Sequence, residues 1–276
     1  MEEKLLQMKS LVERLNQASD SYYNGKGELM TDYEWDALFD QLKRLEEETG
    51  EILPDSPTNR VSEDSIVGKK EEHEFAALSL AKTKQVSDLV KWAEDRPIWI
   101  SWKLDGLTLV VTYDGGKLTK IVTRGNGHIG TNITHLAPAI SGIPATISEK
   151  GHLVVRGEAV ISYADFEQFI IESEGDYANP RNLASGSLTL KDIEEVKQRH
   201  IQWIPFTLVY TERELTSWGE RMQMLKDLGM NPVERERIDH PTTENIQQEI
   251  DKFTEKVTSK KNPFPVDGLV ICYDDT

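Results

Sequence analysis

Residues 98–123 read IWISWKLDGLTLVVTYDGGKLTKIVT, and this stretch predicts the central architecture of the chain. At its start, apolar and other side chains alternate, which places Ile98, Ile100 and Trp102 on one face of a strand. The apolar, β-branched run 107–113 predicts a second strand, and the Asp-Gly-Gly after it is typical of a hairpin turn. The stretch therefore predicts antiparallel strands.

The same patterns continue on the C-terminal side of this hairpin. Strands are expected at 98–103, 107–113, 117–123, 153–161, 203–210 and 266–273, and helices at 163–173, 218–228 and 244–257. Hairpins mixed with helices indicate an α+β fold with antiparallel sheets.

The N-terminal residues 1–48 predict helices, because apolar residues recur at helical spacing. Thr31 and Glu34 form a capping box that would start a second helix. Residues 54–78 are rich in turn-forming and charged residues, which is typical of a linker. We therefore expect a helical subdomain at residues 1–66 and a larger domain at residues 67–276.

Composition and charge exclude several classes of protein. The 276 residues carry a net charge of −16, which excludes nucleic-acid binding through the whole surface, because such proteins are basic. The single cysteine, Cys272, excludes a disulfide framework and a cysteine-rich zinc site within the chain. No apolar run approaches the length of a membrane span, and the N-terminus is unlike a signal peptide. A soluble, cytoplasmic chain is expected.

The most informative motif is Lys-Leu-Asp-Gly at residues 103–106. Lys103 and Asp105 would point to the same side of a strand, and the glycine allows a close turn after them. A lysine amine is nucleophilic only when neutral, and burial or neighbouring cations favour the neutral form. Arg124 and Arg156 are candidate cations near phosphate oxygens. A surface lysine before a turn is the alternative.

Three more polar residues stand out in strands and loops. Glu158 lies in an apolar strand, where an ionised group needs a partner or a ligand. Arg181 lies in a turn-forming stretch, 177–187, suited to contact phosphates. Asp267 begins the last strand, where it can hold a metal ion or orient another polar group. An ordinary ion pair, a long loop and a strand with a polar start are the respective alternatives.

An acidic and aromatic group is expected at the start of the second helix. Asp32 and Asp36 are four residues apart and share a helix face near Trp35, Tyr22 and Tyr23. Carboxylates beside aromatic rings suit a flat cationic ring such as oxidised nicotinamide. In the alternative, Trp35 lies in the core and the acids complement the helix dipole.

Glycines 125, 127 and 130 match the pattern G-x-G-x-x-G, which is also found in Rossmann folds. The preceding strand belongs to a hairpin, Pro138 interrupts any following helix, and no acid ends a second strand about 20 residues later. A Rossmann fold is therefore disfavoured, while a glycine-rich loop near phosphate or ribose fits the pattern.

Taken together and in chain order, these segments resemble the bacterial NAD-dependent DNA ligases. The resemblance covers a helical subdomain that binds nicotinamide mononucleotide (NMN) and an adenylation domain with the nucleotidyltransferase fold. It implies that the adenylation domain, residues 67–276, is truncated at its C-terminal end, because the sequence stops before the family's final lysine motif. It is carried by residues 22–36, 54–58, 77–80, 103–106, 124–125, 156–158, 179–182 and 267–268. One such motif can arise by chance, whereas the ordered series is highly specific.

The resemblance implies that Lys103 attacks the α-phosphate of NAD, carries AMP as a phosphoramidate and releases NMN. Asp105 would orient the lysine or a metal ion, and Glu158 would bond the ribose. Ser79 and Leu80 would line the adenosine pocket, NMN would be held by Tyr22, Tyr23, Asp32, Trp35 and Asp36, and Gly106, Arg124, Arg181 and Asp267 would complete the nucleotide site.

The resemblance also implies cofactors and partners. NAD would be the AMP donor and Mg²⁺ would assist, with no residue assigned as a metal ligand. The complete enzyme would pass AMP to a 5′-phosphate in nicked double-stranded DNA. A monomer without membrane attachment is expected.

The chain departs from the family pattern at several positions. Ser101 stands in place of the usual glutamate two residues before the lysine, Asn126 in place of aspartate, and Trp35 in place of tyrosine. Three further positions lack an expected cation, namely Thr189, Ser259 and Cys272. The loss of three cations near phosphates or DNA is compatible with reduced activity.

Two other functions share part of this evidence. An ATP-dependent ligase or a capping-type nucleotidyltransferase would use the same lysine, but it would not need the acidic, aromatic helical subdomain. A degenerate NAD-binding module without catalysis would fit the missing cations. A mass increase of one AMP after incubation with NAD and Mg²⁺ is the observation that separates these functions.

Overall fold

The computed structural model describes residues 2–23, 29–53, 56–58, 68–77, 80–81, 83–173, 177–190 and 192–275. The side chains of residues 2, 3, 19–23, 32, 33 and 36 lie outside this description. The chain divides into two compact units. One comprises residues 1–65, 72–82 and 125–130, and the other comprises residues 66–71, 83–124 and 131–276.

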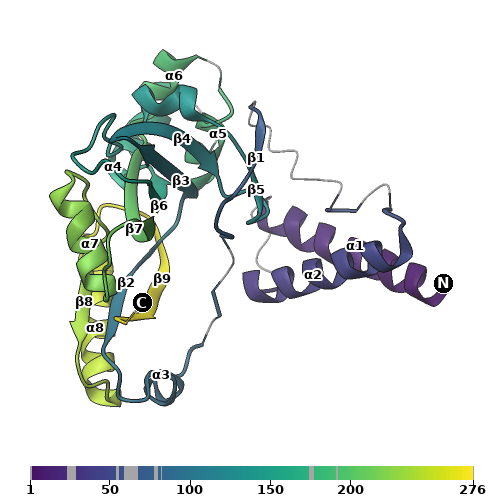
Figure 1. Cartoon of the computed structure of the whole chain (residues 1–276), viewed down its shortest axis with the longest axis horizontal. Coiled ribbons are helices and arrows are strands. Elements are labelled where there is room, and N and C mark those ends of the chain that lie inside the picture. Colours follow the sequence, from purple (N-terminus) through teal and green to yellow (C-terminus); the bar gives the residue numbers. More distant parts are fainter. Residues whose placement is uncertain are drawn as a thin grey trace. The chain divides into compact units, whose positions relative to one another are not determined.

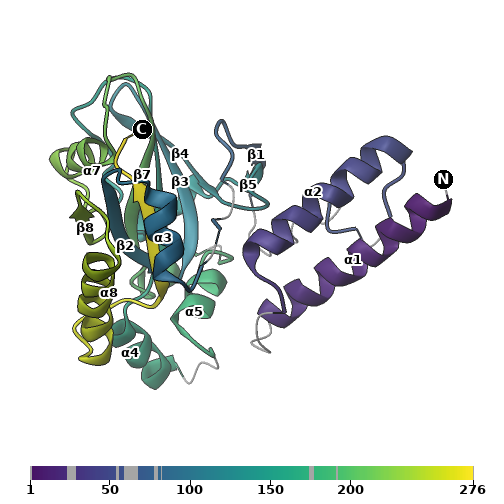
Figure 2. The same cartoon turned by 90° about the horizontal axis from the view of Figure 1, so that it is seen from below.

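The first unit is built on a pair of helices, α1 (Glu2–Tyr23) and α2 (Asp32–Thr49), which run side by side in Figure 1 and Figure 2. The expected capping box is confirmed, because Thr31 and Glu34 bond each other's backbone amides at the start of α2. Gly50 ends this helix in the left-handed conformation. The apolar stripes of the two helices form a core of Met8, Leu11, Val12, Leu15, Phe39, Leu42 and Leu45.

The second unit contains two antiparallel sheets (Figure 1). The four-stranded sheet has the order β4 (Lys117–Thr123), β3 (Leu107–Asp114), β6 (Leu153–Val160) and β7 (Gln202–Thr211). The three-stranded sheet has the order β8 (Arg235–Ile238), β2 (Ile98–Leu104) and β9 (Val266–Tyr273). The expected α+β fold with antiparallel sheets is confirmed.

Helices cover these sheets, and three of them match the predicted ranges closely: α4 (Tyr163–Ser173), α7 (Trp218–Asp227) and α8 (Thr243–Thr258). Phe253 of α8 packs edge to face on Trp102 of β2, with ring centroids 4.6 Å apart. Ile98 and Ile100 are fully buried beside Trp102, as the alternation along the strand predicts.

Several short elements were not predicted. They are β1 (Lys70–Glu72), α3 (Val86–Ala93), β5 (Ile129–Thr131), the 3₁₀ helix η1 (Thr134–Ala139), α5 (Pro180–Ser187), α6 (Ile193–Lys197) and β8. The expectation of a loop around Arg181 was therefore wrong. Asn179 caps α5 and Pro180 opens it, so residues typical of turns here start a helix.

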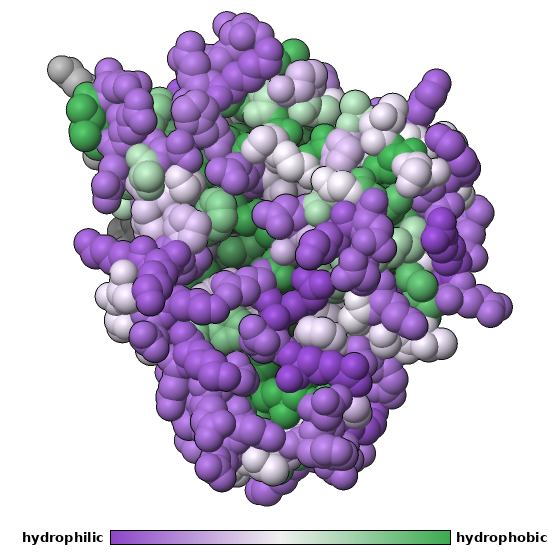
Figure 3. All heavy atoms as spheres, turned by 90° about the vertical axis from the view of Figure 1, so that its left-hand side faces the viewer, coloured by the Kyte–Doolittle hydropathy of each residue, from purple (hydrophilic) through white to green (hydrophobic). Residues whose placement is uncertain are grey.

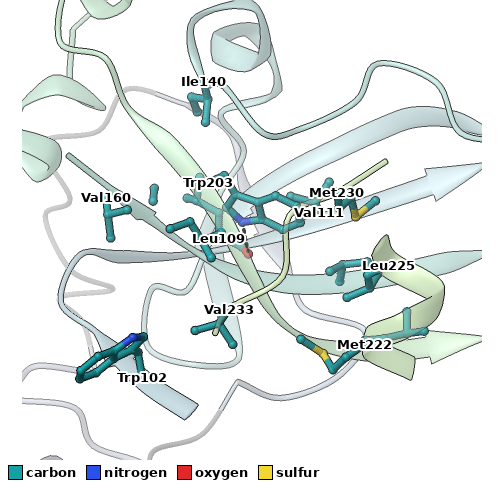
Figure 4. Packing of buried hydrophobic residues seen from close by; sticks show 14 of the residues in the cluster. Trp102, Leu109, Val111, Ile140, Val160, Trp203, Met222, Leu225, Met230 and Val233 are labelled. Atoms are coloured by element: carbon teal, nitrogen blue, oxygen red, sulfur yellow. Dashed lines mark hydrogen bonds between the residues drawn. The ribbon is translucent and has the colours of Figure 1, made fainter. Parts of the chain in front are cut away.

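Trp203 of β7 lies in the hydrophobic core, among buried apolar residues that include Leu109 and Val111 of β3 (Figure 4). Its indole N–H donates to the carbonyl oxygen of Leu109, 3.4 Å away. A Cβ atom at Gly157, on the neighbouring strand β6, would lie 2.5 Å from the indole ring, so only glycine fits at position 157. This packing explains the glycine between Arg156 and Glu158.

Polar side chains form most of the surface that Figure 3 presents, with smaller apolar areas between them.

Candidate active site

Lys103 lies at the end of β2, opposite a bulge in β9. Trp102 pairs with Leu269 and Leu104 pairs with Val266, so Asp267 and Gly268 together oppose one residue, Lys103. Gly268 has a φ of 125°, a conformation that favours glycine. Lys103 Nζ donates to Asp267 Oδ2 at 2.5 Å. The bulge thus brings a carboxylate to the amine.

A second ion pair lies two residues farther along the chain. Arg181 Nη1, on the first turn of α5, donates to Asp105 Oδ1 at 2.7 Å. The backbone amide of Asp105 donates to the carbonyl of Pro265, which ties the turn after β2 to the start of β9. The side chains of Arg181 and Asp105 are about one-third exposed, so both remain accessible to a ligand.

Glu158 supplies a buried carboxylate to the same region. Its Oε1 accepts from the amide of Gly106 at 3.2 Å, and its Oε2 accepts from Thr108 Oγ1 at 2.9 Å. Burial raises the pKa of Glu158 to about 7, while the hydrogen bonds and the positive charges of Arg181 and Lys103 oppose that rise. A Cβ atom at Gly106 would lie 2.1 Å from the carbonyl oxygen of Ala159, so this close approach of backbones requires glycine.

Two arginines carry positive charge on the four-stranded sheet. The amide of Arg124, just after β4, donates to the carbonyl of Thr108, whose strand partner on the other side is Glu158. Arg156 precedes Glu158 by two residues on the same strand and therefore lies on the same face. Burial, and then the charge of Arg124, lowers the pKa of Arg156.

The structure gathers six of the predicted site residues into one cluster: Lys103, Asp105, Gly106, Glu158, Arg181 and Asp267. Other predicted residues belong to the first unit. There, Leu80 is exposed, and Trp35 stacks on Phe39 with its indole N–H donating to the carbonyl of Leu15.

Five predicted site residues fall wholly or partly outside the described part of the chain. Ser79 is not described at all. Tyr22 and Tyr23 end α1, while Asp32 and Asp36 lie in the first turns of α2, and the side chains of these four residues are not described. Their roles therefore stay predictions.

The positions that depart from the family pattern have defined surroundings. Ser101 is buried between Val270 of β9 and Arg235 of β8, its two strand partners. Cys272 is partly buried opposite Trp99, and burial raises its pKa to about 12.

Polar side chains at the other departing positions serve local structure. Asn126 Oδ1 accepts from the amides of His128 and Ile129, at 3.0 and 2.8 Å, and so closes the glycine-rich loop. Thr189 Oγ1 donates to the carbonyl of Gly186 at 2.7 Å. At Ser259 it is the backbone amide that caps α8, by donating to the carbonyls of Glu255 and Val257.

Thr108 was not predicted as a site residue. Its only signal in the sequence was a hydroxyl group in a strand, two residues after the glycine of the lysine motif. Among the described residues, no group of three acidic, histidine or cysteine side chains is arranged to hold a metal ion. No helix within the described ranges is long and apolar enough to cross a membrane.

Comparison with known families agrees with this geometry. Residues 69–276 match the NAD-dependent DNA ligase adenylation domain. Residues 1–62 match the N-terminal NAD⁺-binding domain of DNA ligase-like proteins. The chain belongs to the NAD-dependent DNA ligase family.

Curated relatives in this ligase family match over nearly the whole chain. A DNA ligase of Lachnoclostridium phytofermentans is 39% identical over 281 residues, which is 100% of this chain and 42% of the relative. A DNA ligase of Leptospira biflexa is 36% identical over 273 residues, which is 96% of this chain and 40% of the relative. The chain thus spans about 40% of the length of these ligases.

A solved structure of a mycobacterial DNA ligase D aligns with 65% of this chain and 49% of its own. Its TM-score is 0.40 and its identity is 15%, so this similarity is too distant to refine the site.

Proposed function

We propose that this chain transfers AMP from NAD to Lys103, the first step of a DNA ligase reaction. The observation that carries this proposal is the contact of Lys103 Nζ with Asp267 beside the Asp105–Arg181 pair. As the N–P bond forms at the α-phosphorus, the P–O bond to NMN breaks and NMN leaves with the electron pair. Asp267 is placed to accept the proton that the nitrogen loses.

The other residues of the cluster would position the nucleotide. Arg181 offers a planar guanidinium to phosphate oxygens, and Arg124, near Arg156 at the four-stranded sheet, adds positive charge. Glu158, when ionised, would accept hydrogen bonds from ribose hydroxyls. In-line phosphoryl transfer depends mostly on such positioning and charge neutralisation.

Mg²⁺ belongs to this proposal as an ion held mainly by the substrate. The described residues provide no cage of acidic ligands. Mg²⁺ usually keeps several waters and binds through one or two carboxylates together with phosphates, so the diphosphate of NAD would supply its main ligands.

We further propose that residues 1–66 bind the NMN half of NAD and that residues 67–276 form the adenylation domain. Tyr22, Tyr23, Asp32, Trp35 and Asp36 would hold NMN, and Ser79 with Leu80 would line the adenosine pocket. In the complete enzyme, a monomer in the cytoplasm, AMP would pass to a 5′-phosphate in nicked double-stranded DNA.

Intact-mass spectrometry after incubation with NAD and Mg²⁺ tests the proposal. We expect the mass to increase by one AMP, with no increase when ATP replaces NAD. Lys103→Ala should abolish the adduct, whereas Lys117→Ala, at an exposed lysine of β4, should keep it. An adduct that survives Lys103→Ala, or that ATP supports equally, would contradict the proposal.

A non-catalytic NAD-binding module is the second candidate, because Thr189, Ser259 and Cys272 offer no cation. Binding of NAD measured by calorimetry, without any adduct in the same preparation, would favour this candidate.

A further inference from the structure

We propose that Thr108 is a positioning residue that orients the carboxylate of Glu158 within the nucleotide site. The inference rests on the proposed function for its catalytic meaning, but the contact itself is a property of the fold. Thr108 and Glu158 are direct partners in the pairing of β3 with β6. Their side chains therefore leave the sheet on the same face, where Thr108 Oγ1 lies 2.9 Å from Glu158 Oε2.

Both oxygens of the Glu158 carboxylate accept hydrogen bonds from the segment that leads into β3. Gly106 donates its backbone amide to Oε1 at 3.2 Å, and Thr108 donates its hydroxyl to Oε2. The two donors are two residues apart, with Gly106 just before β3 and Thr108 within it, so together they fix the plane of the carboxylate. Only the donor at 108 is a side chain, and a substitution can remove it without altering the backbone.

Because Glu158 is buried, loss of the Thr108 hydroxyl should affect the ionisation of its carboxylate. The carboxylate is buried, with 8% of the residue exposed, and an unpaired buried charge is costly. Lys103 and Arg181 act on it with positive charge, Arg156 shares its face of the sheet, and Arg124 lies close enough to Arg156 to lower the pKa of that residue. A hydrogen bond to the ionised form supports that form, so loss of the Thr108 hydroxyl should favour the protonated, differently oriented acid.

The alternative explanation is that threonine occupies position 108 for its strand propensity alone. Valine has a similar shape and a similar preference for strands, so Thr108→Val removes the hydroxyl and little else. Thr108→Ser keeps the hydroxyl and removes the methyl group. Thr112→Val is a matched control, because Thr112 is a buried threonine of the same strand that pairs with Val154.

The first measurement is the titration of Glu158 by carbon NMR of protein labelled at glutamate side chains, with Glu158→Gln used to assign the signal. We expect Thr108→Val to raise the pKa of Glu158 by about one unit, a tenfold change in the protonation equilibrium. Thr108→Ser and Thr112→Val should stay close to the parent chain. An unchanged titration in Thr108→Val would overturn the proposal.

The second measurement is the pH profile of self-adenylation for the same four proteins. The rate of Thr108→Val should fall about fivefold to tenfold near pH 7 and recover as the pH approaches 9, where the carboxylate is ionised in every variant. A loss independent of pH and equal in Thr112→Val would indicate a structural role and overturn the proposal. If the titration shifts while even the parent chain forms no adduct, the Thr108 contact stands and the self-adenylation fails.

Discussion

Asp267 Oδ2 lies 2.5 Å from Lys103 Nζ, although the two residues are 164 positions apart in the chain. The contact forms at a bulge in β9, where Asp267 and Gly268 together face a single residue of β2. A regular ladder would leave only one residue of β9 opposite Lys103, so the bulge sets the local backbone geometry in which the carboxylate meets the amine.

The first prediction concerns this bulge. Gly268→Ala should lower the free energy of unfolding by about 1–3 kcal/mol, because a side chain is strained at a φ of 125° even with open space around it. Relief of that strain would move Asp267 and slow self-adenylation. Gly229→Ala, at a φ of 86° and also in open space, is a matched control that should destabilise the chain and leave the rate per folded molecule unchanged. Equal rates in both variants would contradict the role of the bulge.

The second prediction concerns the pH dependence of stability. Burial raises the pKa of Glu158 from 4.5 to about 7, so the folded state binds the proton more tightly than the unfolded state. Stability should therefore decrease as the pH rises from about 4.5 to about 7, by up to about 3 kcal/mol from this group. Urea unfolding of the parent chain and of Glu158→Gln across this range should show a steeper decrease in the parent. Parallel curves would be evidence against the raised pKa.

The third prediction concerns NAD use by the helical unit. Asp32→Ala and Asp36→Ala should each slow self-adenylation with NAD about tenfold, through loss of charge near a cationic ring, and change the melting temperature little. Asp40→Ala, at an exposed acid one turn farther along α2, should leave the rate unchanged. If the loss of rate follows the loss of folded protein, the two carboxylates have only a structural role.

The fourth prediction concerns DNA. A net charge of −16 opposes a polyanion, and each missing phosphate contact reduces both affinity and its salt dependence. We expect residues 1–276 to bind a nicked duplex weakly in a gel-shift titration at low salt and to seal it inefficiently, even where AMP is accepted. Tight binding with multiple-turnover sealing would show that this chain is a sufficient ligase.

Much of the fold could be predicted from local pattern. The ends of β9 and α4 agree with the predicted ranges, and the β3–β4 hairpin turns through Gly115 and Gly116, both with positive φ. The helix α5 was missed, because Asn, Pro, Ser and Gly disfavour helices and its stability comes from burial of Leu183 and Ala184. The strand β8 was missed because the sequence Arg-Glu-Arg-Ile lacks the alternation of a half-buried strand.

For the candidate site, motifs predicted the residues but not their pairing. Lys103 and Asp105 lie two residues apart in one motif, yet each takes its partner from a distant element, Asp267 and Arg181 respectively. Those choices depend on the bulge in β9 and on the unpredicted helix α5, and local sequence does not show which distant side chains these elements bring together. Thr108 was missed for a similar reason, since its importance follows from strand register.

The order β8-β2-β9 also bears on how the protein is made. The strand that carries Lys103 lies between two strands that the ribosome synthesises more than 130 residues later. Until those strands emerge from the ribosome, β2 has neither of its strand partners. The nascent chain then exposes the apolar side chains of Ile98, Ile100 and Trp102. Pairings so distant in sequence form slowly, and Lys103 cannot meet Asp267 before synthesis has passed residue 267.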